Sequence, residues 1–451
     1  PAGSRGMSPP RHREPLNHPL PWRDPWPLVQ ALAAELGREG LVWLDGDGSA
    51  QGHRSCLGLA PLEQRICRGL PGDTGADDPF AALAELAAGG GHWMGWLSYE
   101  AGAWVEPAPH WQSPDMALLW AARHDPVLVI DHPSQRQWLE GQDPGRLSSF
   151  AALLERLDLA APPASQPAAA IAPASWHWHT PPERFADQVE QVLAWIASGD
   201  LFQANLTACC EQQLADPADP LELYGRLRRS CAAPFGGLAI AGAAAAGEAV
   251  LSASPERFLR LDGTGQVETR PIKGTRPRHQ HPEADADAAA DLVTSAKDRA
   301  ENVMIVDLLR NDLGRVCQPG SIQVPQLVGL ESYRQVHHLT SVVRGQLGDG
   351  LSAIDLLRAC WPGGSITGAP KIRACQRLHG LEPVPRGPYC GSLFRLGADG
   401  QFDSSILIRS LLLRGQRLRA HAGCGIVADS DPAAEAEELG WKLQPLLEAL
   451  A

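Results

Sequence analysis

No apolar run in the 451-residue sequence approaches the roughly 18 residues that cross a bilayer, which argues against membrane insertion. The N-terminal residues PAGSRGMSPPRHREP have no apolar stretch after their basic residues, so they do not have the pattern of a secretory signal. We expect residues 1–15 to be a disordered or non-native leader, with Met7 as a native start.

The ten cysteines include no C-x-x-C pair and no Cys/His spacing of the zinc type, which indicates reduced thiols in a cytoplasmic protein. No block of basic residues alternates with aromatic residues, and the net charge is −13, which argues against a nucleic-acid partner. An anionic substrate would therefore need arginines and lysines that gather locally in the fold.

The length suits one large or two medium domains, and the pattern divides the sequence into regions. Residues 16–160 mix short apolar runs with turn clusters, while residues 161–175 (APPASQPAAAIAPAS) have the composition of a linker or a crossover loop. Residues 176–451 form the third region. Helical spacing predicts helices over 182–198 and about 282–316, and a final helix from Pro432. Strands mixed with long helices, without regular βαβ alternation, indicate an α+β fold.

The segment SPERFLRLDGTGQVETRPIKGTRPR (254–278) presents Lys273 in a predicted tight turn, between a proline and a glycine. Three arginines, at positions 270, 276 and 278, are its neighbours in the sequence. Nearby cations and burial disfavour the ammonium form, which would make this amine nucleophilic near neutral pH. A solvated turn lysine is the alternative on spacing alone.

Two acidic pairs have helical spacing. Asp298 and Glu301 are three residues apart in one predicted helix, and Glu435 and Glu438 are three apart in the final helix, so each pair shares a face. If the two faces meet across a cleft, their charges repel unless a cation lies between them. Mg²⁺ suits such a site because it prefers oxygen ligands. Solvated helix surface is the ordinary alternative.

Seven segments together resemble the chorismate-binding enzymes, a group that holds anthranilate, aminodeoxychorismate, isochorismate and salicylate synthases. They appear in family order: the 254–278 segment, AKDRAENVMIVDLLRNDLGRV (296–316), VHHL (336–339), PGGSITGAPK (362–371), YCGSL (389–393), SSILIR (404–409) and HAGCGIVADSDPAAEAEE (421–438). The resemblance implies two large, mostly antiparallel β-sheets packed face to face with helices outside.

Two positions discriminate within this group. The sequence PIKGT is similar to that of aminodeoxychorismate synthases, whereas anthranilate synthases typically carry alanine at the Lys273 position. Gln203 stands where the isochorismate and salicylate enzymes carry a lysine that activates water. The resemblance therefore implies amination of chorismate at C4, with Lys273 as nucleophile at C2, Glu256 as general acid and His338 near the departing hydroxyl.

The resemblance also implies the remaining site residues. Glu301 and Glu438 match direct Mg²⁺ ligands, and Asp298 and Glu435 match residues that act through water. The substrate-binding matches are Gln203, Thr275, Thr367, Tyr389, Arg409, Gly423, Gly425 and Lys442.

The expected partner is a glutamine amidotransferase subunit that supplies ammonia, because no glutaminase domain can be placed in the sequence. The product would serve 4-aminobenzoate and folate synthesis. Two alternatives stay open: the activity of anthranilate synthase component I, and a catalytically idle subunit with a regulatory or amidotransferase-binding role.

Overall fold

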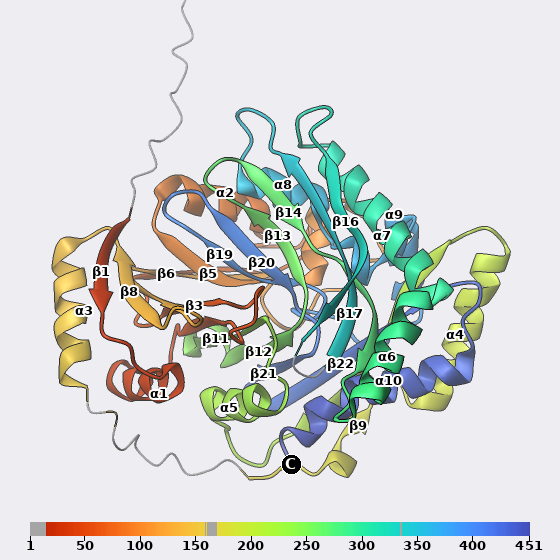
Figure 1. Ribbon diagram of the computed structural model, residues 1–451, viewed down its shortest axis with the longest axis horizontal. Coiled ribbons are helices and arrows are strands. Elements are labelled where there is room, and N and C mark those ends of the chain that lie inside the picture. Colours follow the sequence, from red (N-terminus) through yellow and green to blue (C-terminus); the bar gives the residue numbers. More distant parts are fainter. Residues whose placement is uncertain (1–14, 158, 160–168, 334–335) are drawn as a thin grey trace, which may run out of the picture.

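The computed structural model describes residues 15–157, 159, 169–333 and 336–451, which form two large sheets flanked by helices (Figure 1). All but the last residue of the expected leader, and most of the expected linker, lie outside the described residues. The helices are α1 (Pro25–Leu36), α2 (Pro79–Gly89), α3 (Pro144–Arg156), α4 (Pro182–Ala197), α5 (Pro220–Ser230), α6 (Pro282–Thr294), α7 (Ala296–Gly314), α8 (Ala353–Cys360), α9 (Lys371–His379) and α10 (Pro432–Glu448), with short 3₁₀ turns η1 (Tyr99–Trp104), η2 (Pro173–Ser175), η3 (Ala243–Ala245) and η4 (Gly364–Ile366).

The first sheet has twelve strands and the second has ten, and every recorded pairing is antiparallel. In spatial order the first sheet contains β1 (Leu16–Leu20), β8 (Arg136–Gly141), β7 (Val127–Asp131), β3 (Arg54–Gly58), β2 (Val42–Asp45), β11 (Phe235–Gly242), β12 (Glu248–Ser254), β21 (Ser410–Arg414), β22 (Arg417–Ile426), β10 (Gln203–Gln213) and β18 (Gly368–Ala369), with β9 (His177–Trp178) beside β10. The second contains β15 (Ile272–Pro277), β17 (Val336–Gln346), β14 (Gln266–Thr269), β13 (Arg257–Leu261), β20 (Phe402–Ile406), β19 (Ser392–Leu396), β5 (His92–Leu97), β6 (Leu119–His124) and β4 (Glu63–Cys67), with β16 (Gln323–Ser332) beside β17. The expected fold class is confirmed.

Each sheet joins strands from both sides of the expected linker, since β2 pairs with β11 and β5 pairs with β19. Alternate residues of the first sheet point to opposite sides, as the strand repeat requires. On β12, Val250 belongs to the core that lies between the sheets, whereas Leu251 belongs to the core under the helices. The two expected sequence regions thus share both sheets.

The helix expected over about 282–316 is two helices, which corrects that prediction. Ser295 has an extended backbone between α6 and α7, and its side chain accepts a hydrogen bond from the Asp298 N–H at 3.3 Å. Serine is favoured at such an N-cap because it satisfies a free backbone donor. The break places Asp298 and Glu301 in the first two turns of α7.

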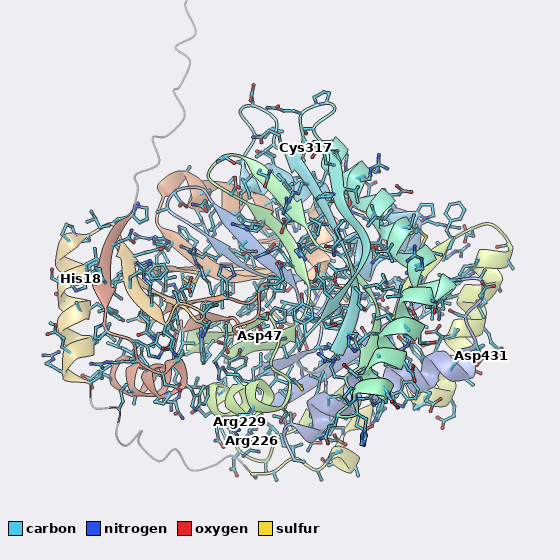
Figure 2. The ribbon with its side chains drawn as sticks, viewed as in Figure 1. His18, Asp47, Arg226, Arg229, Cys317 and Asp431 are labelled. Carbon is cyan, nitrogen blue, oxygen red and sulfur yellow. The ribbon has the colours of Figure 1, made fainter. Side chains whose placement is uncertain are left out.

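The helices expected over 182–198 and from Pro432 are confirmed as α4 and α10. The side chain of Asp431 accepts from the Ala434 N–H at 2.9 Å and so caps α10 (Figure 2). The ten cysteines, all within the described ranges, are free thiols. None of the described helices is both long and apolar enough to cross a membrane.

Candidate active site

Lys273 lies in strand β15, not in the expected tight turn. The strand pairs with β17, and the register shifts between Lys273 and Thr275, so Gly274 forms a bulge with a φ of 82°. A Cβ at Gly274 would lie 2.8 Å from Leu292 and 2.9 Å from the Asp298 side chain. Only glycine therefore permits both this backbone conformation and the close approach of α6 and α7.

The Lys273 amine points into a mostly buried polar site. Its Nζ donates to the carbonyl oxygen of Ser365 at 3.3 Å and lies 4.0 Å from the Glu301 carboxylate. A Cβ added at Gly425 would lie 3.2 Å from this Nζ, 3.2 Å from Glu301 Oε2 and 2.8 Å from Gln203 Nε2. Strands β10 and β22, helix α7 and turn η4 thus converge on the lysine.

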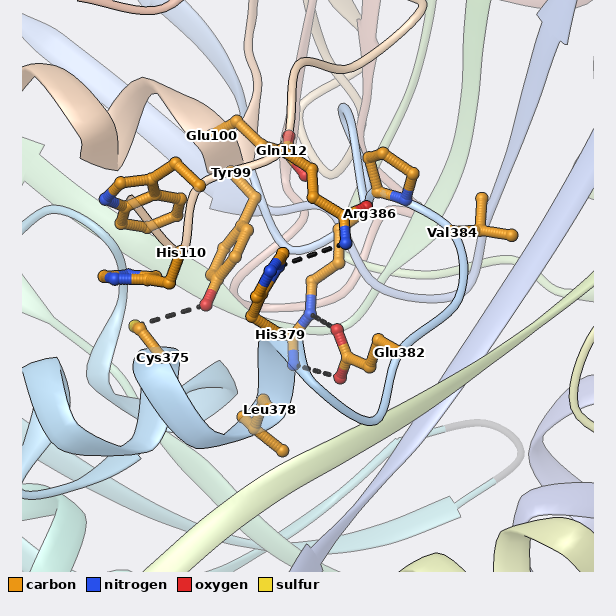
Figure 3. Close-up of a pocket in the computed structure, with 12 residues that line it drawn as sticks. Tyr99, Glu100, His110, Gln112, Cys375, Leu378, His379, Glu382, Val384 and Arg386 are labelled. Carbon is orange, nitrogen blue, oxygen red and sulfur yellow. Dashed lines mark hydrogen bonds and ion pairs between the residues drawn. The ribbon is translucent and has the colours of Figure 1, made fainter. Parts of the chain in front are cut away.

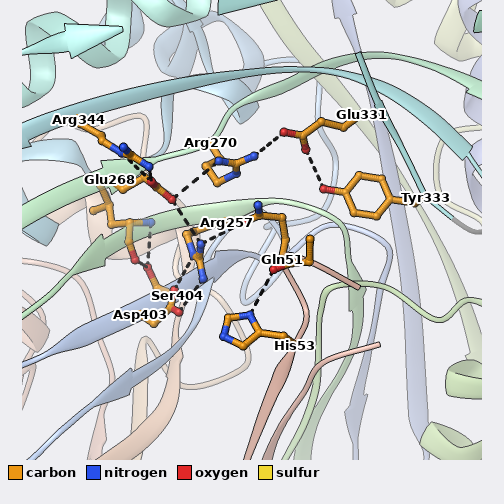
Figure 4. A network of polar contacts seen from close by, with 12 residues as sticks. Gln51, His53, Arg257, Glu268, Arg270, Glu331, Tyr333, Arg344, Asp403 and Ser404 are labelled. Atoms are coloured by element: carbon orange, nitrogen blue, oxygen red, sulfur yellow. Dashed lines mark hydrogen bonds and ion pairs between the residues drawn. The ribbon is translucent and has the colours of Figure 1, made fainter. Parts of the chain in front are cut away.

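The three arginines near Lys273 in the sequence have acidic partners, and no recorded contact among the described residues joins them to its amine, which corrects the expectation that they lie against it. Arg270 pairs with Glu331 at 2.5 Å, within a network of charges that also holds Glu268 (Figure 4). The other two arginines pair with acidic residues of α6 and α7: Arg276 with Asp291 and Asp298, and Arg278 with Asp285. The charged neighbour that contacts Lys273 is instead Glu301.

Glu256 is buried at the corner between β12 and β13, beside Lys273. Burial raises the pKa of this carboxyl to about 7, although a hydrogen bond from the Ser365 hydroxyl, the charge of Lys273 and the Ile272 N–H each act to lower it. A carboxyl that holds its proton near neutral pH is suited to act as a general acid. Glu256 and Lys273, expected as partners, are brought together.

The two acidic pairs meet as expected, but each carboxylate already has a cation. On α10, Glu435 binds Lys297 at 2.8 Å and Glu438 binds Lys442 at 2.7 Å. On α7, Glu301 faces Lys273 and Asp298 lies 3.4 Å from Arg276. These cations offset the repulsion between the carboxylates, because opposite charges at this range stabilise one another even near a surface.

Burial and the neighbouring charges shift the pKa values of these carboxyls in opposite directions. Burial raises the pKa of Glu301, against the charges of Lys273 and Lys297. Burial also acts to raise the pKa of Glu438, but Lys442 and Lys297 outweigh it and the net pKa is lowered. Glu438 is therefore the more readily ionised of the two expected direct ligands.

The donor set fits a hard divalent cation such as Mg²⁺. One group among the described residues brings a thiol and two carboxylates, from Cys424, Glu435 and Glu438, within 4.8 Å of one another, and Glu301 is not part of it. Burial raises the pKa of the Cys424 thiol to about 12, so it stays protonated, and a thiol is a poor ligand for Mg²⁺. The carboxylates remain as the oxygen donors.

The glycines of β22 leave room beside the lysine. Gly423 and Gly425 lie on the face of β22 opposite Cys424, whose side chain belongs to the core under the helices. Lys442 Nζ donates to the Gly423 carbonyl at 2.8 Å, so this lysine reaches from α10 to the site. Gln203, on the neighbouring strand β10, is buried, and within the described part of the chain its Oε1 has no partner.

His338 and His337 are distinguished by their partners. A hydrogen bond of 2.8 Å joins His338 Nδ1 to the Thr275 hydroxyl, and the buried Nε2 is unpaired among the residues that the structure describes. His337 bonds Ser332 and Asp285 and has no free ring nitrogen. Burial and the charge of Arg409 lower the pKa of His338 to about 3, so its ring is neutral near pH 7 and its unpaired nitrogen is available for a hydrogen bond.

Arg409 has no acidic partner among the described residues, because none of the ion pairs recorded for them involves its guanidinium. Burial lowers the pKa of this guanidinium. Such a group favours a carboxylate from a ligand. Tyr389, expected to share this task, is buried and stacks on His421 with ring centroids 4.9 Å apart. The Thr367 hydroxyl donates to the Gly363 carbonyl at 2.9 Å and so holds its own loop.

Two polar residues of the site were not predicted from the sequence. Ser365 contacts both Lys273 and Glu256, and no local pattern indicates this because its partners lie far away in the sequence. Lys297 enters the acidic cluster from α7. A local signal for it existed, since Lys297 and Glu301 are four residues apart on one helix face.

Two pockets lie apart from this cluster. One, of about 350 Å³, is lined by residues such as Tyr99, Glu100, His379 and Arg386 (Figure 3). The other, of about 1020 Å³, lies between strands of both sheets and includes Arg257 in its wall. Neither pocket is lined by Lys273 or by the carboxylates of α7 and α10.

Comparison with known proteins identifies the family. Residues 62–448 match the chorismate binding enzymes. The chain is 40% identical over 372 residues to aminodeoxychorismate synthase component 1 of Salmonella typhimurium, which covers 79% of this chain and 76% of that protein. It is 38% identical over 375 residues to anthranilate synthase component 1 of Streptomyces coelicolor, covering 79% of this chain and 72% of that protein.

A solved structure shows the same architecture. Anthranilate synthase component I of Streptococcus pneumoniae superposes with a TM-score of 0.74 at 28% identity, over 88% of this chain and 93% of that one. The chain therefore belongs to the family of chorismate-binding enzymes.

Proposed function

We propose that the chain converts chorismate and ammonia to 4-amino-4-deoxychorismate. The observation that carries this proposal is the placement of Lys273, whose amine lies beside a proton-holding acid, Glu256, and beside Glu301 of the acidic cluster. Sequence identity alone does not decide between aminodeoxychorismate and anthranilate synthesis. The relatives named for these two activities are 40% and 38% identical to this chain. The lysine favours the former.

In the proposed reaction the Lys273 amine, after losing its proton, forms a bond to C2 of chorismate while the bond between C4 and its oxygen breaks. Glu256 gives its proton to the departing oxygen, which leaves as water. Ammonia then forms a bond to C4 while the bond between C2 and the lysine breaks, and the ionised Glu256 takes up the proton that the new amine releases. Two successive allylic displacements retain the configuration at C4, which a single direct displacement would not.

The other residues bind and orient. Arg409 pairs with one substrate carboxylate, and the neutral ring of His338 offers its unpaired Nε2 near the leaving oxygen. Glu301 and Glu438 would hold Mg²⁺ directly, with Asp298 and Glu435 through water. When bound, the ion supplies positive charge for the second substrate carboxylate.

Ammonia would come from a glutamine amidotransferase subunit. The name "component 1" of the Salmonella relative supports a second component. A lyase that releases pyruvate from the product would then give 4-aminobenzoate for folate synthesis.

One assay tests the proposal. The purified chain is incubated with chorismate, Mg²⁺ and an ammonium salt, and the products are separated and identified by mass. Aminodeoxychorismate is expected, and 4-aminobenzoate only after a lyase is added. Anthranilate fluorescence without a lyase would instead establish the anthranilate synthase alternative, and loss of all turnover would favour an idle subunit.

A further inference from the structure

The acid and the nucleophile share one polar neighbour, Ser365. Its carbonyl oxygen accepts from Lys273 Nζ at 3.3 Å, and its hydroxyl donates to the Glu256 carboxyl. The serine is 8% exposed and lies in η4, between the two large sheets and α7. Within the described ranges, no other residue has polar contacts with both side chains.

The turn that presents Ser365 is held from several sides. A Cβ on Gly363 would lie 2.8 Å from Ile406, and one on Gly364 would lie 2.8 Å from Leu308 of α7, so both glycines pack tightly. The Ile366 carbonyl accepts from Arg386 at 2.7 Å. Arg386 is itself fixed by Glu382 (Figure 3). A turn held in this way has little freedom, so the backbone carbonyl of Ser365 and the Cα from which its hydroxyl extends keep fixed positions.

We propose that Ser365 is a positioning residue of the amination site, fixing the Lys273 amine through its carbonyl and the Glu256 carboxyl through its hydroxyl. This role rests on the proposed function. When the amine has lost its proton and donates one N–H to the Ser365 carbonyl, its lone pair is turned away from that carbonyl and is free for C2. The serine exchanges no proton: the proton passes from Glu256 to the C4 oxygen, and the new bond forms between Lys273 Nζ and C2.

The hydroxyl also affects when Glu256 holds its proton. The groups that face this carboxyl are the Lys273 amine and the Ile272 N–H from β15, and the Ser365 hydroxyl from η4. All three favour the ionised form against burial. Loss of the hydroxyl therefore raises the pKa of Glu256. The pH above which Glu256 has lost its proton, and can no longer act as the acid, moves upward.

The test compares Ser365→Ala with Ser365→Thr, which keeps a hydroxyl. Steady-state rates with chorismate, ammonium and Mg²⁺ are measured across pH, and thermal unfolding is followed in the same preparations. The matched control is Ser392→Ala. It also removes a buried serine hydroxyl, but one that lies on β19. We expect Ser365→Ala to lower kcat roughly tenfold or more with little change in KM. The alkaline limb should move up by about 1 pH unit, the effect of one hydrogen bond to a charged group.

Ser365→Thr should recover most of the rate and the position of the limb, and Ser392→Ala should change neither. A wild-type rate and an unmoved limb in Ser365→Ala would overturn the role of Ser365 alone. Equal losses in the Ala and Thr variants, with an unmoved limb, would overturn it as well, because they indicate a purely structural defect. A wild-type chain that forms no aminodeoxychorismate would remove the proposed function and this role with it.

Discussion

Replacing Glu256 by glutamine should abolish amination and yet stabilise the protein at alkaline pH. The carboxyl has a pKa of about 7 in the folded chain and 4.5 as its ordinary value. Between these values the folded protein keeps a proton that the unfolded chain has lost, so the free energy of unfolding falls as pH rises from about 4.5 to about 7 and then levels off. Glutamine has nearly the same shape and never ionises.

The size of the effect follows from the gap between the two pKa values. At about 1.4 kcal/mol per pH unit, the ionised carboxyl costs about 3 kcal/mol above pH 7, as an upper bound. Thermal and urea unfolding of the wild type and of Glu256→Gln at pH 5, 6, 7 and 8 measures it. The difference between the two chains should be small at pH 5 and greatest at pH 8. Glu190→Gln, on the exposed face of α4, is the control and should show no such trend.

Two results would refute this reasoning. One is a Glu256→Gln variant that is no more stable than the wild type at pH 8. The other is substantial amination by that variant, because an amide cannot supply the proton for the departing oxygen. We expect a variant that is more stable but inactive, because the site keeps a buried carboxyl that lowers the stability of the fold and is needed for the reaction.

Three further substitutions test the remaining roles. Lys273→Ala should reduce the rate of amination at least a thousandfold, on the order expected for loss of a nucleophile. Calorimetry should show that the variant still binds chorismate. Unchanged turnover would contradict the role of Lys273. Glu301→Gln should remove Mg²⁺ binding and activity together. The control, Asp307→Asn, lies on the exposed side of α7 and should affect neither. A Glu301→Gln variant that is fully active and still Mg²⁺-dependent would show that Glu301 is not a ligand. Arg409→Met should raise KM for chorismate about tenfold or more without lowering the unfolding temperature, because the guanidinium forms no ion pair with any of the residues that the structure describes. An unchanged KM would show that the arginine does not bind substrate.

The spacing of residues along the sequence predicted those features of the site that lie within a single helix. The acidic residues of α7 and α10 share helix faces as their three-residue spacing requires, and Asp431 caps α10 as an aspartate before a proline should. The resemblance to the family predicted the sheet architecture, which is confirmed, and it predicted roles for Lys273 and Glu256, which the structure places beside each other. Spacing alone left both open.

The sequence could not predict contacts between distant segments. The arginines around Lys273 were expected to act on its amine, yet partners such as Glu331 and Asp285 neutralise them, and their proximity appears only after folding. Ser365 was missed for the same reason. The break at Ser295 was missed because the serine lies within a long helical pattern, where its capping role depends on the backbone turning there.

The most direct test of the account is whether the Lys273 amine becomes bonded to the substrate. The wild-type chain is incubated with chorismate and Mg²⁺ in the absence of ammonia, quenched with acid and examined by mass spectrometry, both intact and after proteolysis. We expect a mass gain equal to chorismate less one water, located on the peptide that contains Lys273, absent from Lys273→Ala and lost when ammonium is added. Amination by the wild type with no such adduct on that peptide, or an adduct on another residue, would contradict the account.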